Sequence, residues 1–151
     1  KMPDISITTD IIVGFPGETE EDFSETLDIL RRVEYDNIFS FIFSPRSGTP
    51  AADMKCQVPA EVKSERFARL LSLQQEISHK KNESYAGKTI EVLVEGRSKN
   101  NAEMLTGRNG KNRIVHFRGD DSLIGKTVRV KITSADTYTL SGEISEETHD
   151  D

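Results

Sequence analysis

The chain has 151 residues and a formal net charge of −6 at pH 7, with 34% hydrophobic and 30% charged residues. Its single cysteine, Cys56, excludes a disulfide within the chain and a metal site built from cysteines. No apolar run is long enough to span a membrane, and the first residues do not resemble a signal peptide. We therefore expect a soluble, cytoplasmic protein with no membrane partner.

The first predicted element is a buried strand. Ile5, Ile7 and residues 11–13 form a nearly continuous apolar run, which is typical of a strand covered on both faces in a parallel sheet. Gly14 and Gly17 follow, and glycine adopts backbone angles that are closed to other residues. The sequence therefore predicts a tight turn directly after the strand.

A helix is predicted after this turn. Thr19 and Asp22 have the spacing of a capping box, in which an N-cap hydroxyl and an acid three residues later satisfy each other's backbone amides. The helix is expected to run to about Val33. One apolar stripe follows the helical period, formed by Phe23, Leu27 and Leu30.

The turn at residues 14–19 is the best candidate binding site, since ligands of α/β folds usually sit in loops at the carboxyl ends of parallel strands. Four acids at residues 18–22 already complement the helix dipole, which argues against a phosphate there. The turn also lacks the Lys-Ser/Thr ending of a P-loop and the third glycine of a dinucleotide fingerprint. A nucleoside triphosphate is therefore not expected. The alternative is an ordinary, well-capped strand-to-helix turn.

The pattern then repeats. Residues 38–43 predict a second apolar strand, and a long helix is expected from about Pro59 to Asn82. Its inward residues are predicted to be Phe67, Leu70, Leu71 and Ile77. Two parallel strands cannot cover their own faces, so we expect residues 1–83 to be the end of a larger α/β domain that continues upstream.

After residue 83 the helical period gives way to alternation, and residues 84–145 predict several short strands separated by glycines. A small β-barrel or sandwich is the expected fold. The positions predicted to share the inward face are Ile90, Val92, Val94, Val115, Phe117, Val128, Val130, Ile132, Tyr138, Leu140 and Gly142. Residues 146–151 are expected to form a solvated acidic tail.

Charge is segregated along the chain. Residues 1–83 carry −5, residues 84–145 carry +3 and residues 146–151 carry −4. No acid interrupts the stretch from Arg108 to Arg118. A basic face on a small barrel is a usual footprint for RNA. The alternative is a mildly basic face that contacts only water.

Two motifs carry a resemblance to a known family. Residues 9–23, TDIIVGFPGETEEDF, and residues 41–52, FIFSPRSGTPAA, resemble the radical S-adenosylmethionine methylthiotransferases. The closest similarity is to the MiaB-type enzymes, which methylthiolate a modified adenosine beside the tRNA anticodon. Residues 87–143 resemble their C-terminal TRAM domain, an RNA-binding β-barrel.

The resemblance implies a fold and a chemistry. The fold would be the last βαβα of a partial (β/α) radical SAM barrel, followed by a small antiparallel, OB-like TRAM barrel. Such enzymes use S-adenosylmethionine and two 4Fe–4S clusters to abstract hydrogen from the adenine ring and to transfer sulfur and a methyl group. With Cys56 alone this chain cannot hold either cluster, so we expect it to be inactive by itself and to bear no bound cofactor.

Candidate site residues follow from the motifs. We expect Asp10, Gly14, Ser44 and Arg46 to contact the cofactor, since Asp10 is costly to bury without a partner and Arg46 could hold a carboxylate. The residues expected to contact RNA are Arg108, Lys111, Arg113, His116 and Arg118. The expected partners are a tRNA anticodon stem-loop and upstream domains of the same chain.

Two alternatives compete with the tRNA enzyme. The sister family methylthiolates an aspartate of a ribosomal protein, and it usually carries an acid where Arg46 stands. The other alternative is a non-enzymatic RNA-binding module. Arg46 and the positive charge of residues 84–145 favour the tRNA enzyme.

Overall fold

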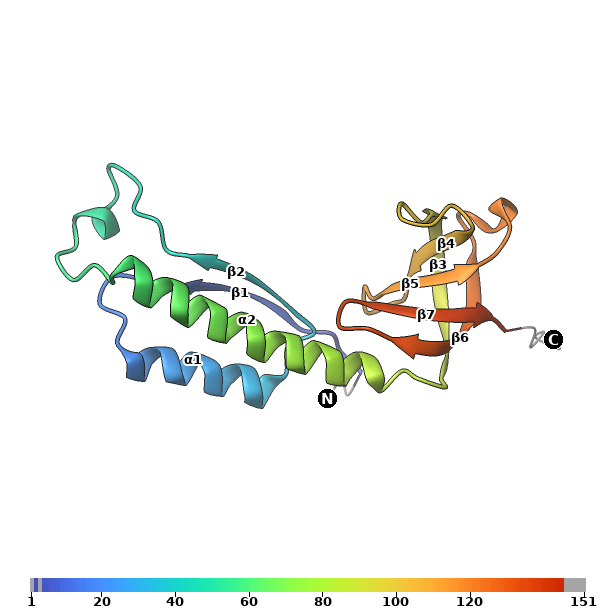
Figure 1. Ribbon diagram of the computed structural model, residues 1–151, viewed down its shortest axis with the longest axis horizontal. Helices are drawn as coiled ribbons and strands as arrows, with labels where there is room; N and C mark the ends of the chain where they lie inside the picture. The colour runs from blue at the N-terminus through green and yellow to red at the C-terminus, as the bar shows by residue number, and fades with distance from the viewer. Residues whose placement is uncertain (1, 3, 146–151) are drawn as a thin grey trace. The chain divides into compact units, whose positions relative to one another are not determined.

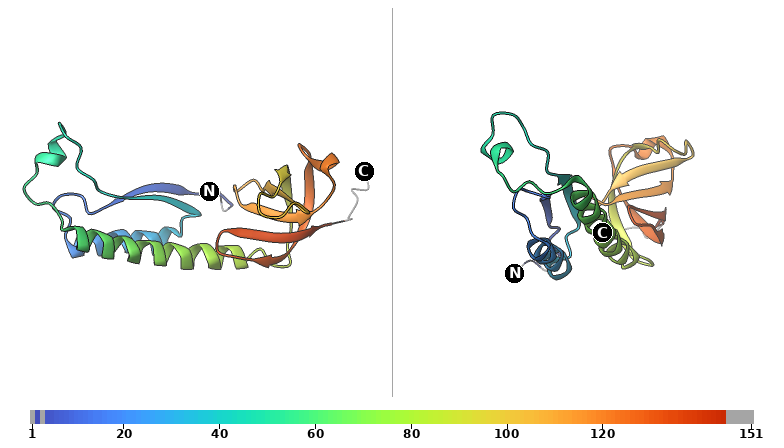
Figure 2. Two further views of the ribbon diagram at one scale, coloured as in Figure 1. Left: turned by 45° about the horizontal axis from the view of Figure 1, so that its top comes forward. Right: turned by 60° about the vertical axis from the view of Figure 1, so that its left-hand side comes forward.

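The computed structural model describes residue 2 and residues 4–145; the predicted acidic tail lies outside the described residues. The chain divides into two compact units, Lys1–Ser78 and His79–Asp151. The first is α/β and the second is a β-barrel, as Figures 1 and 2 show.

The first unit is a two-stranded sheet with two helices packed on one side of it (Figures 1 and 2). Strand β1 (Thr8–Val13) pairs in parallel with β2 (Asn37–Ile42). Helix α1 (Glu20–Val33) connects them, and a short 3-10 turn (Pro50–Asp53) leads to α2 (Ala60–Glu83). The parallel strand–helix–strand prediction is confirmed. The buried core consists of Val13, Phe23, Leu27, Leu30, Ile38, Leu70 and Ile77.

The predicted capping box at the start of α1 is also confirmed. The Thr19 side chain accepts a hydrogen bond from the Asp22 backbone amide at 3.1 Å, and the Asp22 carboxylate accepts from the Thr19 amide at 2.8 Å. At the other end, Glu34 adopts a left-handed conformation and its amide bonds the carbonyl of Leu30. Hydrogen bonds between residues three or four positions apart therefore cap both ends of this helix.

Two burial predictions for this unit are wrong. Leu71, expected to face inward, is exposed, because it lies beside the buried stripe through Leu70 and Ile77. The sheet is covered on one face only: Ile12, Phe39 and Phe41 are each more than half exposed. The two helices pack on the opposite face, and no other described segment of this unit covers these three side chains.

The second unit is a closed barrel of five strands (Figure 1). In chain order they are β3 (Thr89–Arg97), β4 (Met104–Arg108), β5 (Ile114–Arg118), β6 (Thr127–Ala135) and β7 (Thr139–Ile144). A 3-10 turn (Asp121–Leu123) precedes β6. The strand order around the barrel is β3-β4-β5-β7-β6. The predicted small β-barrel is confirmed. Of the eleven positions predicted to face inward, eight are buried, Ile90 and Val128 are half-buried, and Tyr138 is exposed because it lies in the turn before β7.

The prediction of a purely antiparallel barrel is wrong for one pair, because β5 and β7 run parallel. The reason is geometric: strands around a closed ring cannot alternate in direction when their number is odd. One neighbouring pair must therefore be parallel, and it is the pair that closes this barrel.

Two glycines allow the barrel strands to approach closely. A Cβ atom added at Gly107 would collide with the carbonyl oxygen of Leu93, and one added at Gly142 would collide with that of Lys131. Both positions face the core, where neighbouring backbones leave no room for a side chain.

Within the described residues, neither helix is long and apolar enough to cross a membrane. That the first unit is the end of a (β/α) barrel stays a prediction, since the described residues contain two of the strands that such a barrel needs.

Candidate functional site

The turn after β1 has the tight geometry that its glycines predict. Gly14 and Gly17 have φ angles of +77° and +89°, a region that favours glycine. The Glu18 amide donates to the carbonyl of Phe15 at 2.9 Å. The Gly17 amide donates to the carbonyl of Cys56 at 2.8 Å, which fastens the turn to the segment before α2.

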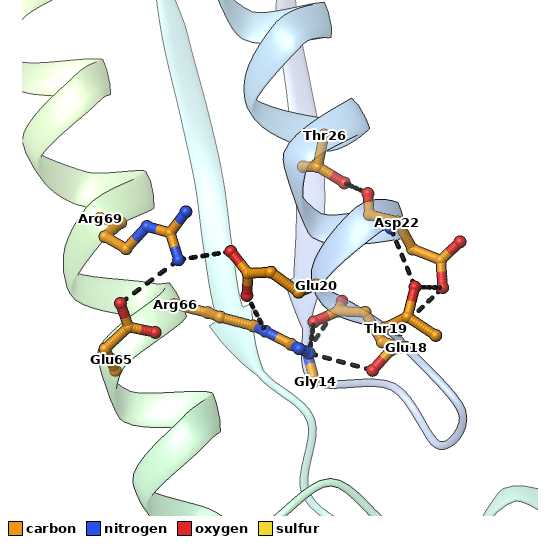
Figure 3. A network of polar contacts seen from close by, with 9 residues as sticks. All are labelled: Gly14, Glu18, Thr19, Glu20, Asp22, Thr26, Glu65, Arg66 and Arg69. Atoms are coloured by element: carbon orange, nitrogen blue, oxygen red, sulfur yellow. Dashed lines mark hydrogen bonds and ion pairs between the residues drawn. The ribbon is translucent and has the colours of Figure 1, made fainter.

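An arginine of α2 holds this turn from the helix side, as Figure 3 shows. The Arg66 guanidinium donates to the Glu18 carboxylate at 2.9 Å and to the Glu18 carbonyl at 3.0 Å. The second carboxylate oxygen of Glu18 accepts the Gly14 amide at 3.0 Å. The Arg66 side chain is 6% exposed and that of Glu18 13%, so this ion pair is largely shielded from water.

A second, more exposed ion pair flanks the first. Arg69 contacts Glu20 at 2.7 Å and Glu65 at 3.3 Å, and Arg66 reaches Glu20 at 3.3 Å (Figure 3). The hydrogen bond from Arg69 lowers the pKa of Glu20 below its ordinary value. Hydrogen bonds from Thr19 likewise lower the pKa of Asp22. The start of α1 is thus occupied by the chain's own charges, which agrees with the exclusion of a phosphate there.

A pocket of about 540 Å³ opens at the carboxyl end of β2. Its wall is mostly apolar, with two polar side chains predicted to bind the cofactor, Ser44 and Arg46; both are exposed. The Phe15 ring packs edge-on against Phe43 at 5.3 Å, which links the turn after β1 to this loop. The pocket is lined by Ile12, Phe41, Ile42, Phe43, Ser44, Arg46, Thr49 and Ala51.

Lys63 of α2 connects the two loops. Its ammonium group donates to the carbonyl of Phe43 at 3.1 Å, at the last residue before Ser44. Its aliphatic stem fills the space that a side chain at residue 14 would need. Gly14 therefore permits the close approach of α2, and its contact with a cofactor stays a prediction.

Asp10 lies on the uncovered face of the sheet, in register with Phe39 of β2. Its side chain is exposed, so the expectation that Asp10 is buried and needs a partner is wrong for this chain. The side chain is exposed because no described segment of the first unit packs on that face. Asp10 does not line the pocket with Ser44 and Arg46, although Ile12, two residues along the same face, does.

Sequence reasoning missed Lys63 and Arg66. A detectable signal existed, because both lie on the helical face of α2 that carries Leu70 and Ile77. A cation on the buried side of an amphipathic helix needs a partner. The pattern does not identify that partner, because Glu18 lies 48 positions before Arg66 in the chain.

On the barrel, two of the residues predicted to contact RNA share the outer face of β5. His116 lies opposite Thr106 of β4 and Ser141 of β7, and Arg118 lies opposite Met104. Arg118 is the most exposed of the predicted set, with 80% of its side chain accessible and a loose ion pair to Glu103 at 3.6 Å. His116 is half-buried, and within the described residues its Nδ1 has no hydrogen-bond partner.

Arg113, which we also predict to contact RNA, does not lie on this open face. Its guanidinium donates to the Asn82 side chain at 2.7 Å and lies 5.7 Å from the centre of the Tyr85 ring. The side chain is half-buried, because it packs against the end of α2. Arg113 therefore has a structural role that the alternation of β5 could not reveal.

Arg108 is the last residue of β4 and Lys111 lies in the β4–β5 turn; both are half-buried. Arg108 pairs with Glu95 at 3.2 Å and donates to the Asn112 side chain at 2.9 Å. The turn itself is organised by Asn109, whose side chain accepts the backbone amides of Lys111 and Arg113. Internal hydrogen bonds therefore fix the conformation of Arg108 and of the turn that carries Lys111.

Among the described residues, no group of histidine, cysteine and acidic side chains could hold a metal ion. Cys56 is an exposed, free thiol.

The chain is similar to known proteins in both of its units. Residues 83–145 match the family model of the TRAM domain. The chain is 58% identical over 143 residues to tRNA-2-methylthio-N(6)-dimethylallyladenosine synthase of Acetivibrio thermocellus, which covers 95% of this chain and 30% of that protein. Proteins of the same name from Geobacillus kaustophilus and Bacillus subtilis are each 57% identical, covering 97% and 95% of this chain and 28% of their own length.

These similarities confirm the resemblance to the MiaB-type methylthiotransferases. They extend through both units, since they cover nearly the whole chain. The chain spans about three tenths of the length of these curated relatives.

Proposed function

We propose that this chain, which is related over 95% of its length to tRNA methylthiotransferases, is the C-terminal part of an enzyme of that activity. The parent enzyme would add a methylthio group to a modified adenosine next to the tRNA anticodon. It would act in the cytoplasm, with the upstream domains of the same protein as partners. The observation that carries the proposal is the 58% identity across both units, with a TRAM domain at residues 83–145.

The residues at the end of β2 fit S-adenosylmethionine. A pocket of about 540 Å³ lies within the range of small-molecule sites. Its apolar wall suits an adenine ring, and Arg46 can form a charge-assisted bond to a carboxylate. When bound, S-adenosylmethionine supplies the methyl group and the radical chemistry of this family. Asp10, on the uncovered face of the sheet, and Ser44, in the pocket, would bind its amino group and hydroxyls, and Gly14 would shape the adjoining turn.

The iron–sulfur clusters do not fit residues of this chain. Cubane clusters are held by several cysteine thiolates, and the chain has one cysteine. Cluster ligands would have to come from other parts of the longer protein. Sequencing the gene upstream of Lys1 tests this directly: a CxxxCxxC motif there would establish the enzyme class, and its absence would favour an RNA-binding module without the radical chemistry.

The cofactor site is tested by substitution in the full-length, cluster-loaded protein. Asp10→Ala and Arg46→Ala should each weaken S-adenosylmethionine binding by about tenfold, the loss of one charged hydrogen bond. Arg32→Ala is a suitable control, because Arg32 is an exposed residue of α1 paired only locally with Asp28. Wild-type affinity in both variants would remove this site assignment.

The tRNA substrate is favoured over a ribosomal protein. The three relatives are all named for tRNA modification. Arg46 is a cation at a position where we expect the sister family to carry an acid, and residues 84–145 carry a net positive charge. In this proposal the TRAM barrel contacts phosphates of the anticodon stem-loop through Arg118, Lys111 and Arg108, with His116 beside them and Arg113 in a supporting role.

A further inference from the structure

We infer that Arg66 is a positioning residue for the cofactor site: from α2 it fixes the turn after β1 in the shape that the site at the carboxyl ends of β1 and β2 requires. The inference rests on the proposed function, because it concerns that same site. No contact between Arg66 and the cofactor is implied.

The first argument is the density of contacts between one side chain and one turn. Arg66 binds both the carboxylate and the carbonyl of Glu18, at 2.9 and 3.0 Å. Glu18 in turn accepts the Gly14 amide at 3.0 Å through its other carboxylate oxygen. A guanidinium is planar and rigid, so these bonds fix direction as well as distance. The conformation of residues 14–18 therefore depends on Arg66.

The second argument is burial. The side chains of Arg66 and Glu18 are 6% and 13% exposed, and a shielded ion pair depends strongly on both partners being present. Removing Arg66 would leave the Glu18 carboxylate without its cation. Glu18 would then turn toward water and release the Gly14 amide. The exposed pair of Arg69 and Glu20 has no comparable hold on the turn.

The third argument is that α2 holds both loops of the site from one face. Lys63, one helical turn before Arg66, donates to the carbonyl of Phe43, directly before Ser44. Phe15, inside the turn that Arg66 holds, packs against Phe43. A displaced turn would therefore also shift the wall of the pocket. Displacements of about 1 Å at such a wall can cost up to about a hundredfold in function.

The experiment compares Arg66→Met with Arg69→Met in the full-length, cluster-loaded protein. Arg69 is the matched control, since it lies on the same helix, also bonds Glu20 and also packs on the Phe23 ring, yet it does not touch Glu18. Hydrogen exchange of residues 14–18 and the S-adenosylmethionine dissociation constant are measured for both. Arg66→Met should accelerate exchange at the Gly14 and Glu18 amides and weaken binding at least about tenfold. Arg69→Met should change binding by less than about twofold.

A conservative variant guards against simple unfolding. Arg66→Lys keeps the charge but lacks the rigid, planar set of donors of a guanidinium, so its affinity for S-adenosylmethionine should lie between those of wild type and Arg66→Met. If circular dichroism shows that Arg66→Met does not fold, the comparison with Arg69→Met is made with Arg66→Lys instead. Faster exchange with unchanged affinity would overturn the inference, as would an equal effect of Arg69→Met.

The outcome is separable from that of the proposed function. If Asp10→Ala and Arg46→Ala weaken binding while Arg66→Met does not, only the positioning role fails. If none of the three changes the dissociation constant, the cofactor site itself is misplaced.

Discussion

The Asn82 side chain, buried at the end of α2, accepts a hydrogen bond from Arg113 at 2.7 Å. Its amide group also donates to the carbonyls of Asp136 and Thr137, at 2.7 and 3.0 Å. A single buried amide thus joins three segments of the second unit: the end of α2, the residue before β5 and the β6–β7 turn. This relationship explains why Arg113 is not available as an open RNA contact.

We predict that Asn82→Ala destabilises the barrel by about 1–3 kcal/mol, because it leaves two carbonyls and a half-buried guanidinium without this partner. The free energy of opening, from hydrogen exchange of buried amides in β5 and β7, measures the effect. Asn100→Ala, at an exposed position in the β3–β4 loop, should leave it unchanged. Equal stability of the two variants would show that the hydrogen bonds of the Asn82 side chain make no net contribution to the stability of the barrel.

The close packing of β3 against β4 gives a second prediction. Gly107→Ala should destabilise the barrel by about 2–3 kcal/mol or prevent folding, since the added methyl group meets the Leu93 carbonyl. Gly110→Ala is the matched control, because nothing lies within 4 Å of a Cβ at that position. Thermal unfolding followed by circular dichroism distinguishes the two. A stable Gly107→Ala variant would contradict so close an approach of these strands.

A third prediction concerns acid. Hydrogen bonds from Thr19 lower the pKa of Asp22 in the folded state, and the bond from Arg69 lowers that of Glu20. The folded state therefore binds these protons less readily than the unfolded chain, and the stabilisation is present above the ordinary pKa values of 3.8 and 4.5. It is lost as the pH falls through the lower, folded values.

Hydrogen exchange of the α1 amides at neutral pH and at about pH 3 checks this dependence. Asp22→Asn should make the stability of α1 less sensitive to acid than in wild type. Thr19→Ala should cost about 1 kcal/mol at neutral pH, the usual loss for an N-cap, whereas Ser24→Ala on the exposed side of α1 should cost little. If the stability of α1 in Asp22→Asn depended on pH as it does in wild type, the acid sensitivity could not be assigned to the Asp22 carboxylate.

The fourth prediction concerns RNA. Arg118→Ala should weaken binding of an anticodon stem-loop and reduce the slope of log affinity against log salt by about 0.7–0.9, the value for one lost phosphate contact. Arg118 is preferred to Arg113 for this test, because a substitution of Arg113 would remove its hydrogen bond to Asn82. Arg32→Ala on α1 should bind like wild type. Identical, salt-independent curves would remove the RNA role of this face.

Patterns in the sequence predict the elements of this chain well where the interactions are local. The glycine turn, the capping box of Thr19 and Asp22, and the period-two core of the barrel depend on neighbours a few residues apart. The alternation around Val115 and Phe117 identifies the core strand β5, since side chains of a strand alternate between faces. The family resemblance depends on the same contiguous motifs.

Contacts between residues far apart in the chain cannot be predicted from these local patterns. Arg66 and Glu18 are separated by 48 positions, and Asn82 and Arg113 by 31, so no periodic pattern could pair them. The parallel pair of barrel strands is likewise a property of the closed, odd-numbered ring. The apolar strand around Asp10 predicts burial, but whether that face is covered depends on what packs over it. Short-range patterns thus specify the elements and their inner faces, whereas contacts across the fold specify which charged side chains shape the candidate site.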